Sequence, residues 1–214
     1  MSYVTRLPST VRVTRRESII DSVGRELMAA GLDPSSDAAR EWLMNRAREI
    51  FKIVPSGGIL RDPDRYVNDT HKLLPGRMYL FYYNALGKDE LPYWDKLPLV
   101  FPVQKYKDGF LGINFHYLAP HLRYILFDQL LKFRNNNKYD ETTRLKLSYQ
   151  LISTFAKSHV AKPTLHRYLY TQFKSRILWI QPTDWEVCLS LPCEAFVGKL
   201  KQGVWKESRK IILS

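Results

Sequence analysis

The segment Met78-Tyr79-Leu80-Phe81-Tyr82-Tyr83 is aromatic and apolar on both faces, which is the composition of a buried β-strand. A polar loop follows over 84–96, and the apolar segment 97–103 then predicts a second strand. The prolines at positions 98 and 102 favour an edge strand or a bulge, because proline cannot donate to a strand ladder. A third strand is expected over 110–118, after a turn at Lys107-Asp108-Gly109 in which glycine would allow positive φ.

Two later apolar segments, 176–180 and 185–191, flank a turn at Gln181-Pro182-Thr183-Asp184 and are also predicted to be strands. They are suitably placed to close the sheet that begins at residue 78. We therefore predict the α+β fold class, with a strongly curved antiparallel sheet of the SH3-like or OB-like barrel type and flanking helices. The expected inward-facing side chains alternate along the strands: Tyr79, Phe81, Tyr83, Leu99, Phe101, Ile113 and Phe115.

Helical spacing of apolar residues predicts helices outside these strands. Two are expected before residue 55, one from Thr14 to Gly31 and one from near Ser35. Three more should begin near Pro120, after Asp140 and at Pro163, the last running to Phe173. Turn-forming residues over 55–69 suggest a boundary, so we divide the chain into an N-terminal arm and helical region (1–70) and an α+β domain with a curved sheet (71–214).

The charge balance is strongly basic, with a formal net charge of +12. This favours a polyanionic partner, nucleic acid first and an anionic membrane surface second. No stretch is apolar over eighteen residues and the N-terminal residues do not resemble a signal peptide, so we expect neither a membrane span nor export. Cys188 and Cys193 are the only cysteines, which fits a reducing compartment and disfavours a zinc site or a disulfide.

The basic residues are concentrated in one part of the chain. The 42 residues from Thr142 to Thr183 contain no Asp or Glu and seven Lys or Arg, where about four acids would be expected from the overall composition. Cations with aromatic neighbours can neutralise phosphates and stack on unpaired bases, with Tyr168 or Tyr170 as candidate stacking residues; a core position for both tyrosines is the alternative. The cations expected to bind nucleic acid are Lys157, Lys162, Arg167, Lys174 and Arg176.

Known catalytic motifs are missing from the sequence, including the Walker loop, the nucleophile elbow and the zinc-protease signature. His116 and His121 are not spaced as a preset metal pair. Asp62, Asp64 and Asp69 would suit two-metal phosphoryl chemistry, but aspartates in a proline-rich segment are usually turn formers. We therefore predict a protein that is not an enzyme and has no cofactor, metal or small-molecule substrate, and we regard a nuclease as the least favoured alternative.

Three segments resemble a known family: Pro-Gly-Arg-Met-Tyr-Leu-Phe-Tyr-Tyr-Asn (75–84), Leu-Pro-Tyr-Trp-Asp-Lys-Leu-Pro-Leu-Val (91–100) and Gly-Phe-Leu-Gly-Ile-Asn-Phe-His-Tyr-Leu-Ala-Pro (109–120). They are similar to segments of the DNA end protector proteins of T4-like tailed phages. Ser-Arg-Ile-Leu (175–178) and Val-Trp-Lys-Glu-Ser-Arg (204–209) resemble the C-terminal region of that family. Residues 1–70 carry no such resemblance.

The resemblance implies a non-enzymatic virion protein at the genome terminus that blocks the host's recombination exonuclease and assists head completion. Its implied partners are double-stranded DNA ends and other virion proteins, and its implied location is the virion, assembled in the host cytoplasm. The alternative is a structural subunit of the phage neck, tail or baseplate, whose basic surface meets acidic faces of neighbouring subunits. The residues shared with the family are mainly glycines and the side chains expected to face the interior of a barrel. Such residues identify a fold and are compatible with either role.

Overall fold

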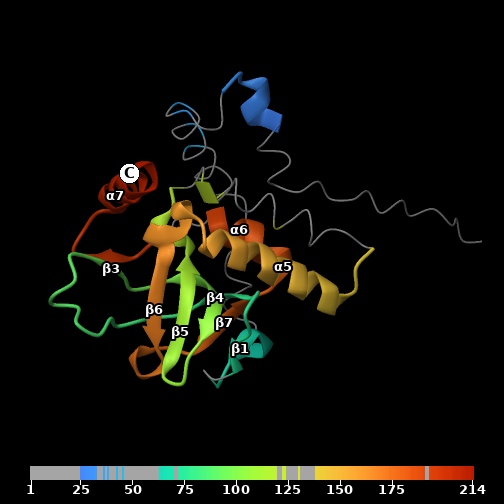
Figure 1. Ribbon diagram of the computed structural model, residues 1–214, viewed down its shortest axis with the longest axis vertical. Coiled ribbons are helices and arrows are strands. Elements are labelled where there is room, and N and C mark those ends of the chain that lie inside the picture. Colours follow the sequence, from blue (N-terminus) through green and yellow to red (C-terminus); the bar gives the residue numbers. More distant parts are fainter. Residues whose placement is uncertain are drawn as a thin grey trace, which may run out of the picture.

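The computed structural model describes residues 25–32, 36, 38, 42, 45, 63–69, 72–119, 122–123, 130, 138–190 and 193–214. Among these, five strands lie between residues 66 and 114, and helices and strands are mixed after them (Figure 1). The strands are β1 (Tyr66–Val67), β2 (Met78–Leu80), β3 (Trp94–Asp95), β4 (Leu99–Lys105), β5 (Gly109–Asn114), β6 (Leu165–Leu169), β7 (Ile177–Ile180) and β8 (Phe196–Val197). Besides a helix over 25–29, the described α-helices include α5 (Glu141–Ala156), α6 (Trp185–Ser190) and α7 (Lys201–Leu213), and the described 3₁₀-helices include η1 (Pro63–Arg65), η3 (Phe115–Tyr117), η4 (His159–Thr164), η5 (Tyr170–Gln172) and η6 (Pro182–Asp184).

A six-stranded antiparallel sheet organises the fold, in the order β1-β7-β2-β4-β5-β6. The α+β class and the expected strands at β2, β4, β5 and β7 are confirmed, and β7 does join the sheet that begins at residue 78. The sheet is not closed into a barrel, since β1 and β6 remain its edges. An isolated bridge between Tyr83 and Phe173 brings the segments that follow β2 and β6 together. β3 and β8 form a separate two-stranded sheet.

Two positions in the β4–β5 hairpin differ from expectation. β4 is an inner strand, and it accommodates Pro102 through a register shift between Pro102 and Gln104, so the bulge is confirmed and the edge position is wrong. Gly109 does not have a positive φ. Its lack of a side chain is needed for another reason, because a Cβ there would lie 1.9 Å from the Tyr168 carbonyl oxygen on β6.

Both faces of the sheet are buried. On one face, Phe101, Ile113 and Phe115 pack with Ile152 of α5 and Trp185 of α6. The other face carries an aromatic cluster in which the ring of Tyr168 stacks on Phe110 and meets Phe81 edge-on. The expected inward-facing residues are therefore buried as predicted, but on two faces: Tyr79, Phe81 and Tyr83 on one, and Leu99, Phe101, Ile113 and Phe115 on the other.

Two predicted elements are wrong. Residues 165–169, expected to be helical, form β6, because they pair with the exposed edge of β5 from Gly109 to Ile113. Residues 185–190, expected to be a strand, form α6, whose Trp185 is buried and donates an indole hydrogen bond to the Ile180 carbonyl at 3.0 Å. Short apolar segments fit helix and strand patterns almost equally well, so their tertiary partners decide between them.

The helix predicted after Asp140 is confirmed as α5, and the Asp140 carboxylate caps it by accepting from the Thr143 amide at 2.8 Å. The first helix was predicted to end at Gly31. The described helix over 25–29 is followed by a turn in which Gly31 has φ +67°, a conformation common at the C-terminal ends of helices. Most of the expected N-terminal region, 1–70, lies outside the described residues. Within the described part of the chain, no helix is long and apolar enough to cross a membrane.

Candidate nucleic-acid interface

The five cations expected to bind nucleic acid are all exposed, but they fall into two groups separated by β6. Lys157 and Lys162 precede this strand, whereas Lys174 and Arg176 follow it, and Arg167 lies on it. A strand of five residues is about 16 Å long. The structure therefore does not gather the five predicted residues into one cluster.

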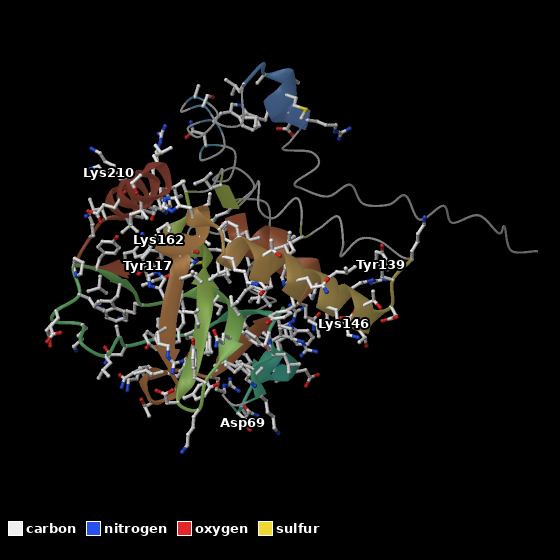
Figure 2. All side chains as sticks on the ribbon, in the orientation of Figure 1. Asp69, Tyr117, Tyr139, Lys146, Lys162 and Lys210 are labelled. Atoms are coloured by element: carbon white, nitrogen blue, oxygen red, sulfur yellow. The ribbon has the colours of Figure 1, made fainter. Side chains whose placement is uncertain are left out.

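Lys162 lies close to a second set of cations that come from the C-terminal helix, and Lys157 precedes η4 in the chain. α7 packs directly against η4, which carries Lys162. The side of α7 that faces the protein buries Val204, Trp205 and Ser208, and Figure 2 shows Lys210 and Lys162 in the same region of the molecule. We call these exposed cations the η4–α7 surface; they are Lys157, Lys162, Lys206, Arg209 and Lys210.

Buried polar contacts fix α7 in place. The Trp205 indole donates a hydrogen bond to the main-chain carbonyl of His116 at 2.8 Å, and Arg123 donates to the same carbonyl at 3.2 Å. Arg123 also forms a buried ion pair with Glu194 at 2.6 Å, and Lys201 at the start of α7 reaches Glu194 at 3.3 Å. Burial raises the pKa of Glu194, but Arg123 and the neighbouring cations outweigh this and lower it below its ordinary value. The basic helix is thus attached to a charged internal cluster.

The second group of predicted cations is partly neutralised. Arg167 forms an ion pair with Asp108, and its guanidinium lies 3.9 Å from the centre of the Tyr106 ring. Arg176 lies over the ring of Tyr66 at 4.2 Å. Lys174 is exposed, with its main-chain amide hydrogen-bonded to the segment after β2. Of these three residues, Arg167 is the one whose charge an acidic side chain compensates in the described part of the chain.

The two candidate stacking tyrosines have different environments. Tyr168 is 4% exposed, and its ring stacks on Phe110, so it belongs to the core and its proposed role in base stacking is wrong. Tyr170 is half-buried in η5 and keeps part of its ring accessible near Arg167. A partly exposed aromatic residue beside a cation is therefore still a candidate for stacking on an unpaired base.

A buried polar chain, which the sequence did not indicate, lies beneath the attachment of α7. Asp95 accepts hydrogen bonds from Asn114 at 2.9 Å and from His116 Nδ1 at 2.7 Å, and the opposite ring nitrogen of His116 lies 3.4 Å from Cys193 Sγ. Burial lowers the pKa of His116, but the Asp95 carboxylate, with a contribution from Cys193, raises it to about 10. Burial likewise raises the pKa of Asp95, and the charge of His116 more than compensates, so that it is lowered.

The residues considered for metal chemistry do not come together in the part of the chain that is described. Asp62 and His121 lie outside it, while Asp64 is in η1 and Asp69 follows β1. No group of three or more His, Cys, Asp or Glu side chains is arranged there to hold a metal ion. His116 is committed to Asp95 and Cys193.

Comparison with known proteins gives a match to a protein family. The family described as phage T4 terminal DNA protecting protein matches residues 65–211, which is more than half of the chain and includes the six-stranded sheet and nearly all of α7. No curated protein and no solved structure matches the chain significantly. The matched region also contains every cation of the η4–α7 surface. The chain belongs to the phage T4 terminal DNA-protecting protein family.

Proposed function

We propose that this protein binds the ends of packaged double-stranded phage DNA without cutting it, and that the η4–α7 surface contacts the phosphates. In the virion it would lie at the genome terminus beside other virion proteins and assist head completion. The family membership supports the choice of DNA termini as the partner. The exposed cations support the choice of surface.

The observation that carries the proposal is the near absence of acidic residues around this surface. Residues 157–164 contain none, and residues 199–214 contain only Glu207. Glu207 forms an ion pair with Lys199, so its charge is compensated locally. The five exposed cations of the surface therefore lie in segments that contain few acidic residues, and neutralising five phosphates would give a slope of about −4 to −5 in log K against log salt.

Recognition of an end needs a feature besides charge. We assign it to the second group of cations, Arg167, Lys174 and Arg176, together with the partly exposed ring of Tyr170. At a duplex end the terminal base pair frays, and an aromatic ring can stack on the freed base. Phosphate contacts from the η4–α7 surface would hold the duplex, and the second group would meet its terminus.

The test compares linear and covalently closed circular DNA of one length and sequence, each at two salt concentrations. We expect tighter binding to the linear form, a steep decrease in affinity with salt, and protection of the linear form from an exonuclease that starts at ends. Equal affinities would leave only a generic basic surface. Lack of binding to either form at low salt would favour the alternative of a neck, tail or baseplate subunit, as would density that places the chain in an ordered ring away from the DNA.

A further inference from the structure

Asp95, His116 and Cys193 form a continuous hydrogen-bonded chain that DNA binding does not use. Asp95 and His116 are almost completely buried, with side-chain exposures of 1% and 0%. Cys193 is half-buried and lies at the end of the chain, 3.4 Å from the second ring nitrogen of His116. A nucleophile, a base and a residue that orients the base are arranged in the same order in enzymes with activated thiols.

The carboxylate of Asp95 is held rigidly in this arrangement. Besides His116 and Asn114, the main-chain amides of Leu97 and Ala195 donate to it at 3.1 and 3.3 Å. With Nδ1–H of His116 directed at Asp95, the other ring nitrogen faces Cys193. One proton then lies between Nε2 and Sγ, on the nitrogen or on the sulfur.

We propose that Cys193 is a nucleophilic thiol that reacts with small disulfides, with His116 retaining the proton. In this step the Cys193 sulfur attacks one sulfur of the disulfide, a new S–S bond forms and the original S–S bond breaks. The distant sulfur leaves as a thiolate, while Nε2 of His116 carries the proton. Cys193 is oxidised to a mixed disulfide, and the departing half of the reagent is reduced to a thiol.

A purely structural role explains Asp95 and His116 but does not require a cysteine. A thiol is a weak hydrogen-bonding group, so it stabilises a buried imidazolium less than a hydroxyl or a carbonyl would. What distinguishes sulfur at this position is its reactivity. Cys188 provides the contrast within the same chain, because it is 4% exposed and burial raises its pKa to about 12.

The test uses the full chain and an aromatic disulfide, dithiobis(nitrobenzoate), whose released thiol is coloured. The rate is measured for the folded chain and for the chain in denaturant at the same pH, and the labelled cysteine is identified by peptide mapping. We expect the folded chain to react at Cys193 about tenfold faster or more, because a thiolate held beside protonated His116 would replace the few per cent of thiolate that an ordinary cysteine has near pH 7, while Cys188 stays unlabelled.

Three variants sharpen this test. Cys193→Ser should abolish the fast reaction and Cys188→Ala should preserve it, whereas His116→Gln, if it folds, should slow the reaction to the unfolded rate. The comparison of the folded and unfolded native chain remains decisive if His116→Gln fails to fold. The proposal is overturned if folded Cys193 reacts no faster than the unfolded chain, or if label appears on Cys188 or on neither cysteine.

Discussion

Trp205, on the basic helix α7, donates its indole hydrogen bond to the main-chain carbonyl of His116, a residue of the buried charged cluster. This one contact joins the candidate phosphate-binding surface to the interior of the protein. Trp205→Phe keeps an aromatic ring but removes the indole donor together with the atoms of the second ring, so we expect the free energy of unfolding to fall by at least about 1 kcal/mol. Urea unfolding measures the change.

Trp179→Phe is the matched control for that variant. The Trp179 indole nitrogen is buried and has no hydrogen-bond partner among the described residues. Losing this donor should therefore cost less than losing that of Trp205, or should stabilise the protein slightly. Equal destabilisation by the two variants would contradict the assigned role of the Trp205 hydrogen bond.

Single cations of the η4–α7 surface should each contribute to the salt dependence of DNA binding. We expect Lys162→Ala and Lys210→Ala to reduce the slope of log K against log salt by about 0.9 each, and to weaken binding to all duplex sequences alike. Titrations of linear duplex DNA at several salt concentrations measure this slope. Lys88→Ala, in the exposed loop over 84–93, is the control and should leave it unchanged.

Arg167→Ala should reduce the same slope by less than Lys162→Ala does. Arg167 is already paired with Asp108, so fewer counterions are released from the DNA when it binds. Asp108→Asn should then strengthen binding, since it frees the Arg167 charge. A larger effect of Arg167→Ala than of Lys162→Ala would instead place the main phosphate contacts at the second group of cations.

Two histidines, the buried His116 and the half-buried His166, should set the pH of maximum stability. The pKa of His116 is raised to about 10 from 6.5, so its contribution is complete below pH 6.5 and is lost as the pH rises towards 10. Burial lowers the pKa of His166 to about 4, so the unfolded chain takes up a proton that the folded chain does not, and stability is lost as the pH falls from 6.5 towards 4.

Stability should therefore be highest near pH 6.5 and decline on both sides, by roughly 1 kcal/mol per pH unit where one proton separates the two states. Urea unfolding across this range measures the curve. His159→Ala, which alters an exposed histidine, should leave its shape unchanged. A stability that increases steadily from pH 6 to 9 would contradict the charge state assigned to His116.

Gly109→Ala tests the close contact between β5 and β6. The added methyl group would lie 1.9 Å from a main-chain oxygen, so a strand must move, and we expect a loss of about 3 kcal/mol. Gly87→Ala is the control, because Gly87 has φ +71° and open space around it, and only the backbone strain of about 1 kcal/mol applies. Thermal or urea unfolding distinguishes the two.

The sequence predicted the sheet well where side-chain alternation and turn residues agreed. The pattern at Tyr79, Phe101 and Ile113 correctly predicted buried strand positions, and Asp140 correctly predicted the start of α5. It failed at residues 165–169 and 185–190, where a short apolar segment takes its conformation from partners far away in the chain. α7 was not predicted.

The candidate sites could likewise be predicted only in part, because they too depend on contacts between residues far apart in the chain. Exposure of the five predicted cations followed from their charge, but their division by β6 depended on an element that was predicted to be helical. Asp95, His116 and Cys193 lie 21 and 77 residues apart along the chain, so no local spacing relates them. Only the folded sheet and the attachment of α7 bring them together.

The position of β7 in the sheet has a consequence for how the chain folds. β7 lies between β1 and β2, so Tyr66 pairs with Leu178 although more than a hundred residues separate them. The chain must close this long loop before β1 gains any partner, and such non-local pairing slows folding. The β4–β5 hairpin can form early from neighbouring residues, whereas the β1 edge can be added only after β7 has docked on β2. We expect refolding on the millisecond-to-second timescale rather than in microseconds, with residues 66–67 the last part of the sheet to gain protection from hydrogen exchange.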